Sequence, residues 1–141
     1  MLMAMREAEK AREANEVPCG CVVVKAGRVI ARGWNQVESL KDATAHAEML
    51  ALTAAEAAVG DWRLEGCTVY VTKEPCPMCA GGIINSRIEA VHYAAREEKM
   101  GCCGSVLNLF EERFNHHPRI YRGPMEVECE EQLQEFFRNL R

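Results

Sequence analysis

The amino-acid sequence predicts an α/β sandwich built around one mixed β-sheet. Short β-branched, apolar runs alternate along the chain with alanine-rich segments of helical spacing. Two such runs near the start are separated only by a turn, whereas the later runs are separated by helical segments. Strands that alternate with helices are typical of α/β folds. We therefore expect an antiparallel opening hairpin followed by parallel strands in the same sheet.

The first half of the chain predicts a helix, a hairpin and a second helix. In the first fourteen residues, apolar side chains recur at helical spacing with charges between them. The segment VPCGCVVVKAGRVIARGWN (17–35) predicts two strands joined by a turn at Ala26-Gly27. Residues 45–59 are rich in alanine, which favours a helix, and Gly60 is expected to end it.

The second half predicts two further strands and three helices. CTVYVT (67–72) is typical of a buried strand, and EAVHYAA (89–95) predicts another. Pro77 suits the first turn of a helix over 77–86, because the N–H that proline lacks would be unpaired there anyway. A short helix near 105–110 and a final helix over 128–138 complete the pattern.

The composition is that of one globular domain, which we expect to span residues 1–141. Hydrophobic residues make up 48% of the chain, yet no apolar run approaches the roughly 18–20 residues of a membrane span. Early charges such as Arg6 and Glu7 would interrupt the apolar region of a signal peptide. These features predict a cytoplasmic protein with no membrane partner.

Cysteine content and charge constrain the chemistry and the partners. In a reducing compartment the 8 cysteines are expected to stay free for metal binding or catalysis. The net charge of −4 provides no general attraction for nucleic acid, so such a partner would need a local basic patch. The candidate patch, whose alternative is an ordinary solvated surface, comprises Arg113, His116, His117, Arg119, Arg122, Arg138 and Arg141.

The most informative pattern is His46 and Glu48, followed about thirty residues later by Cys76 and Cys79 behind a proline. Zinc prefers thiolate sulfur and imidazole nitrogen in a tetrahedral arrangement, and three protein ligands leave one position for water. The two cysteines lie three apart at an expected helix start, so their sulfurs can reach one point. One histidine and two cysteines therefore predict a site for one zinc ion per subunit.

Glu48 distinguishes an enzyme from a structural zinc clip or a redox pair, neither of which needs a carboxylate. On a regular helix, positions 46 and 48 would lie about 200° apart and would not share a face. Glu48 is therefore expected to reach the zinc-activated water as a general acid–base group. His-x-Glu followed by Pro-Cys-x-x-Cys is the signature of zinc nucleobase deaminases. A fourth protein ligand, from Cys19, Cys21 or Cys102, would instead indicate a non-catalytic zinc module.

Three segments, TAHAEMLAL, YVTKEPCPMCAGGIINSRI and GCCGSVLNLF, resemble the cytidine deaminase-like superfamily. Nearly end to end, the chain is similar to the bacterial tRNA-specific adenosine deaminases, which convert the wobble adenosine of an anticodon to inosine. This resemblance implies a three-layer α/β/α sandwich with a central five-stranded mixed sheet. It also implies a homodimer that binds the tRNA anticodon loop. The alternative that keeps the same site is a deaminase of a free base or nucleoside, such as guanine, cytosine or cytidine.

The resemblance also implies roles for individual residues. His46, Cys76 and Cys79 would ligate zinc, and Glu48 would transfer protons. Asn35 would hydrogen-bond the flipped base. The other residues that would wall the pocket or contact the anticodon loop are Val17, Pro18, Ala47, Pro75, Asn115, His116, Phe136, Phe137 and Arg138.

The chain departs from the family pattern at several positions around the expected pocket. Cys19 and Cys21 place thiols where the family often has valine and alanine, and Ala43 stands where a proline is usual. Lys73 replaces a leucine-like residue and could contact phosphate, while Glu97 replaces a frequent aspartate. We expect these changes to affect the substrate rather than the chemistry.

Overall fold

The computed structural model describes residues 1–140 and contains a five-stranded mixed sheet with the strand order β2-β1-β3-β4-β5. Strand β1 pairs antiparallel with β2 and β3, whereas the β3–β4 and β4–β5 pairs are parallel. The predicted antiparallel hairpin and the later parallel strands are confirmed. The strands are β1 (Gly20–Lys25), β2 (Arg28–Trp34), β3 (Cys67–Lys73), β4 (Ala90–Ala95) and β5 (Arg119–Arg122).

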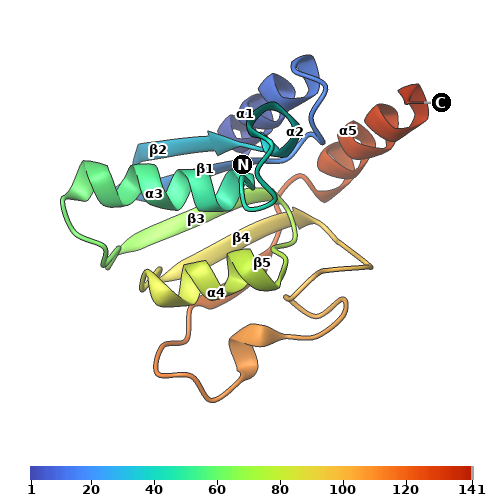
Figure 1. Ribbon diagram of the computed structural model, residues 1–141. Coiled ribbons are helices and arrows are strands. Elements are labelled where there is room, and N and C mark those ends of the chain that lie inside the picture. Colours follow the sequence, from blue (N-terminus) through green and yellow to red (C-terminus); the bar gives the residue numbers. More distant parts are fainter. Residues whose placement is uncertain (141) are drawn as a thin grey trace.

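Helices cover both faces of this sheet and make three layers. Helices α3 and α4 lie side by side on one face (Figure 1), where they enclose the larger apolar cluster with residues such as Val69 and Val91. Helices α1 and α5 pack on the other face around a smaller cluster that includes Ala94 and Leu133. The helices are α1 (Leu2–Glu13), α2 (Val37–Leu40), α3 (Ala47–Val59), α4 (Pro77–Asn85) and α5 (Glu126–Asn139).

Local sequence signals agree with most of these elements. The hairpin turn is where it was predicted, with Ala26 at φ 51° and Gly27 at φ 75°, the left-handed pair that matches the twist of two strands. The eight cysteines are free thiols, as predicted. None of the helices within residues 1–140 has the length and apolar character needed to cross a membrane.

Three elements differ from the prediction. The prediction of a helix near 105–110 is wrong. The chain forms only a 3₁₀ turn there, η1 (Leu109–Glu111), and the preceding residues form a loop. Strand β5, with the sequence RIYR, and the single-turn helix α2 were not predicted. Strand β5 is short and largely exposed, so it lacks the apolar run that marks a buried strand.

A close contact between β2 and α3 determines where the first turn of α3 lies. Gly33 faces that turn, and a Cβ at this position would overlap the backbone of Ala47 and Ala51. Only the absence of a side chain lets the helix approach the strand so closely. The residues at the start of α3, including His46 and Glu48, are thereby held against the sheet.

Candidate active site

Three potential metal ligands meet where α3 and α4 begin. His46 is the N-cap of α3, Cys76 is the N-cap of α4, and Cys79 lies in the first turn of α4. His46 Nδ1 is 3.5 Å from both Cys76 Sγ and Cys79 Sγ. All three donor atoms lie within 4.8 Å of one another. Two helices on one face of the sheet thus bring together residues about thirty positions apart.

The spacing of these donors fits a zinc ion. Tetrahedral zinc with bonds of about 2.1 Å to nitrogen and 2.3 Å to sulfur places such atoms roughly 3.6 Å apart. The observed 3.5 Å agrees with this value. Within residues 1–140, no further His, Cys, Asp or Glu joins the group, so Cys19, Cys21 and Cys102 do not complete a closed, four-ligand module.

The cluster already favours a thiolate. Hydrogen bonds from Cys79 and then His46, acting against burial, lower the pKa of Cys76 to about 4. The hydrogen bond with Cys76, together with burial, raises the pKa of Cys79. The pKa of His46 is also raised, chiefly by its hydrogen bond with Cys76. Because thiolate is the form of cysteine that ligates a metal, Cys76 is prepared for binding.

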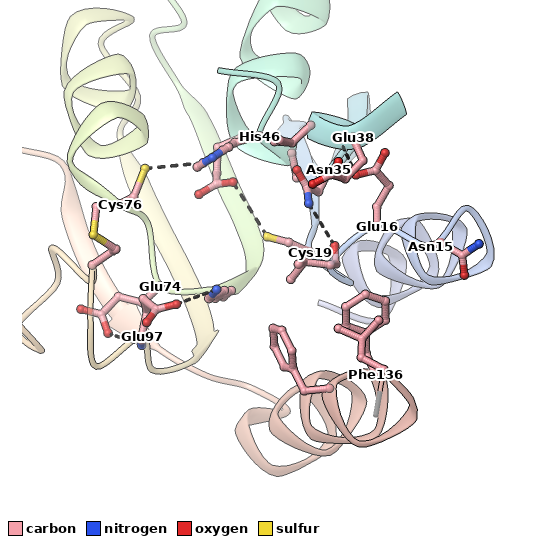
Figure 2. A pocket seen from close by; sticks show the side chains of 18 residues that line it. Asn15, Glu16, Cys19, Asn35, Glu38, His46, Glu74, Cys76, Glu97 and Phe136 are labelled. Carbon is pink, nitrogen blue, oxygen red and sulfur yellow. Dashed lines mark hydrogen bonds and ion pairs between the residues drawn. The ribbon is translucent and has the colours of Figure 1, made fainter. Parts of the chain in front are cut away.

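Glu48 lies in the first turn of α3 and is 3% exposed. The backbone of His46 is extended, with φ −77° and ψ 153°, so the separation expected on a regular helix does not apply. Burial raises the pKa of Glu48, and Cys19 Sγ donates a hydrogen bond to its Oε1 at 3.9 Å (Figure 2). A buried carboxylate of raised pKa holds a proton more readily than an exposed one, which suits a group that must take up and release a proton.

A pocket of about 530 Å³ opens in front of these groups. Asn35 Nδ2 donates to the carbonyl of Val17 at 3.3 Å, whereas Asn35 Oδ1 is buried and has no hydrogen-bond partner within residues 1–140. This oxygen is a free acceptor in the pocket wall. The lining side chains, several of which are labelled in Figure 2, are Asn15, Glu16, Val17, Cys19, Asn35, Val37, Glu38, His46, Ala47, Glu48, Lys73, Glu74, Cys76, Glu97, Met100, Phe136, Phe137 and Leu140.

Several residues that the sequence assigned to the substrate lie at this pocket. Val17, Asn35, Ala47, Phe136 and Phe137 belong to its lining. The two prolines, Pro18 and Pro75, are fully buried beside the wall. Cys19, whose position the sequence left open, also lines the pocket.

Other predicted contacts lie away from it. His116 Nε2 is 2.6 Å from the carbonyl of Ile88, next to the start of β4 and therefore at the opposite end of the sheet from Lys73. Asn115 precedes it on an exposed loop, and Arg138 is exposed on the last turn of α5. Within 1–140, these three residues do not line the pocket of their own chain, and their roles stay predictions.

The predicted basic patch is partly neutralised. Arg119 pairs with Glu89 at 2.9 Å, and Arg122 pairs with Glu130 at 3.5 Å. Arg141 lies outside the described residues. The tail is therefore less positive than its sequence suggests.

Glu74 is a buried positioning residue that the sequence reasoning missed. Its carboxylate accepts hydrogen bonds from the backbone N–H groups of Glu97 (3.1 Å), Cys103 (2.8 Å) and Ser105 (3.1 Å), and from the Ser105 hydroxyl (2.5 Å). It thereby ties the loop over 97–105 to a position two residues before Cys76. The partners are mainly backbone groups, which no residue pattern identifies.

The sandwich fold and the site together define a hydrolytic deaminase of the cytidine deaminase-like class. A histidine and two cysteines spaced for zinc, beside a buried glutamate in a pocket, are the components that this chemistry requires. The whole chain, residues 1–141, matches the family model of the MafB19-like deaminases. The chain belongs to this family.

Individual relatives narrow the comparison. The chain is 51% identical over 142 residues to the tRNA-specific adenosine deaminase of Bacillus subtilis (strain 168), a match covering 100% of this chain and 88% of that one. It is 46% identical over 140 residues to the tRNA-specific adenosine deaminase of Aquifex aeolicus (strain VF5), covering 99% and 92%.

Solved structures of deaminases have the same fold as this chain. A structure from a study of A-to-I editing by tRNA:A34 deaminases at the wobble position superposes with a TM-score of 0.90 and 44% identity, covering 94% of this chain and 97% of that one. A guanine deaminase from Bacillus subtilis superposes with a TM-score of 0.66 and 31% identity, covering 98% and 90%. The fold therefore matches the RNA-editing structure better than the free-base enzyme.

Proposed function

We propose that this protein hydrolytically deaminates adenosine to inosine at the wobble position of tRNA, using one zinc ion per subunit. The observation that carries the proposal is the His46, Cys76 and Cys79 donor set beside the buried Glu48 in a pocket. The 51% identity to a tRNA-specific adenosine deaminase supports the choice of substrate. We further propose that residues 1–141 act as one cytoplasmic domain, as the composition indicates, and that the protein forms a homodimer, as the family resemblance implies.

The proposed chemistry relies on Glu48 as the proton carrier. Zinc held by His46, Cys76 and Cys79 would supply a water activated for attack on C6 of adenine. Glu48 accepts a proton from the attacking water and delivers it to the ring nitrogen next to C6. It then passes the remaining proton of the new C6 hydroxyl to the amino group, so the C6–N bond breaks, ammonia leaves and C6 becomes the carbonyl carbon of inosine. The burial and raised pKa of Glu48 suit both directions of transfer.

The pocket wall offers groups that would hold a flipped base. The unpaired Oδ1 of Asn35 can accept a hydrogen bond from the base edge. Phe136 and Phe137 at the pocket provide aromatic surface for stacking. Extruding a nucleotide is least costly from a single-stranded loop, which favours an anticodon loop as the substrate.

The test is to incubate the zinc-loaded protein with an anticodon stem-loop carrying adenosine at the wobble position, and separately with guanine, cytosine, adenosine and cytidine. We expect inosine in the RNA and no ammonia from the free compounds. Ammonia from a free base with the stem-loop unchanged would overturn the proposed substrate. A zinc-loaded Glu48→Ala variant should release no ammonia, and full activity there would overturn the proton-transfer role.

A further inference from the structure

A lysine–glutamate pair forms part of the pocket wall where β3 ends. Lys73 Nζ is 2.6 Å from Glu97 Oε2, and both side chains line the pocket. Lys73 is the last residue of β3, three positions before Cys76.

Lys73 is the exception in an otherwise acidic wall. Within residues 1–140, no other lysine and no arginine belongs to the lining. The lining carboxylates are Glu16, Glu38, Glu48, Glu74 and Glu97. An RNA chain that inserts a base here approaches a wall in which carboxylates outnumber basic side chains. With a net charge of −4, the protein supplies no general attraction to offset the negative charge of these carboxylates.

The pair can open without disturbing the wall. Lys73 and Glu97 side chains are 26% and 18% exposed, and ion pairs that solvent can reach contribute little to stability. Glu97 keeps other contacts when the lysine leaves. Its N–H donates to Glu74 at 3.1 Å, and its Oε1 accepts from the backbone N–H of Lys99 at 3.0 Å. The lysine can therefore change partners while the glutamate stays in place.

We propose that Lys73 is a phosphate-binding residue of the substrate site, whose ammonium group exchanges Glu97 for a backbone phosphate adjacent to the target adenosine. The inference rests on the proposed function and adds to it the group that selects a polynucleotide over a free nucleoside. Lysine suits this role because its compact charge sits on a long flexible stem and can follow a phosphate.

The test compares Lys73→Met with Lys99→Met in the zinc-loaded enzyme. Lys99 is an exposed residue of the 97–105 loop and does not line the pocket. Its variant therefore removes the same charge from outside the pocket and keeps the backbone N–H that donates to Glu97. We expect Lys73→Met to raise KM for the stem-loop roughly fivefold with kcat unchanged. The slope of log(kcat/KM) against log[KCl] should become shallower by about 0.7, the value for one contact to a single strand. Lys99→Met should leave both quantities at the wild-type values.

RNA with uncharged backbone linkages tests whether Lys73 binds a phosphate or has only a structural role. On a stem-loop whose phosphates beside the wobble adenosine are replaced by methylphosphonates, wild type and Lys73→Met should have equal KM values. Glu97→Gln, which releases the lysine, should lower KM for the charged RNA. A Lys73→Met defect that persists on neutral linkages, or a salt slope equal to that of wild type, would overturn this inference alone. A wild-type enzyme that leaves every stem-loop unchanged would overturn the proposed function and this inference with it.

Discussion

Replacing Glu74 by glutamine tests whether one buried carboxylate holds the loop beside the metal donors. Each carboxylate oxygen accepts two hydrogen bonds: Oε1 from Glu97 N and Ser105 Oγ, and Oε2 from Cys103 N and Ser105 N. Glutamine has the same shape but only one acceptor oxygen. The NH₂ group of the introduced glutamine must therefore face the two donors that bonded to the oxygen it replaces.

The magnitude follows from counting these donors. In the better orientation, the amide oxygen of the introduced glutamine keeps the two bonds of Oε2, and the Ser105 hydroxyl turns to accept from the new NH₂. The N–H of Glu97 is then unpaired, which costs about 1–3 kcal/mol when buried. The remaining bonds lose their charge assistance, a further loss of roughly 1 kcal/mol. We expect Glu74→Gln to lose about 2–4 kcal/mol from a total stability of about 5–15 kcal/mol, so the variant should still fold.

The assay is urea unfolding at pH 7 together with amide hydrogen exchange at Cys103 and Ser105. Glu98→Gln is the matched control, because the Glu98 side chain is 74% exposed and makes only a long ion pair, 3.8 Å, with Arg96. The control should change the free energy of unfolding by no more than about 0.5 kcal/mol. A Glu74→Gln loss below about 1 kcal/mol with unchanged exchange at Ser105 would refute the reasoning.

Four further substitutions test other parts of the molecule. Burial acts to raise the pKa of Glu16, but hydrogen bonds from Ser39 and Glu38 outweigh it and lower that pKa. Its stabilisation is therefore present above the unfolded pKa of about 4.3 and is lost as the pH falls through the lower, folded pKa. In urea unfolding, the difference in stability between wild type and Glu16→Gln should narrow as the pH falls below about 4.3. Gly33→Ala should cost about 1–3 kcal/mol by forcing α3 from β2, and an unchanged Tm would contradict this. Cys79→Ser should lower the zinc content per chain measured by mass spectrometry, whereas full occupancy would argue against ligation. Phe137→Ala should raise KM for the stem-loop about tenfold and leave kcat unchanged; no change in KM would exclude stacking.

Local pattern was enough to predict much of the framework. The strands over 67–72 and 89–95 and the helix over 77–86 match β3, β4 and α4 to within about one residue, because their periodicity and start signals lie within each segment. The donor set was predictable for a similar reason. A ligand at a helix N-cap and another three residues later face one point wherever that helix lies.

The misses share a different cause. Strand β5 depends on β4 to pair with it, and its four residues carry no apolar signal of their own. The helix expected over 105–110 does not form, because backbone N–H groups of that segment bond outside it: Ser105 to the Glu74 carboxylate, and Val106 and Leu109 to carbonyls of the preceding loop. The role of His116 in substrate binding, which the family resemblance implies, stays a prediction; within its own chain the residue lies beside Ile88.

The sequence by itself determined the fold class, the four residues His46, Glu48, Cys76 and Cys79, and the chemistry that they support. Only the tertiary structure decided that Cys19 faces Glu48, that Asn35 keeps a free oxygen, and that the lysine at the end of β3 meets Glu97 in the pocket wall. The physical reason is the distance along the chain over which each signal acts. Helical and strand spacing repeats within a few residues, whereas burial and electrostatic partners depend on contacts between segments that are distant in the chain.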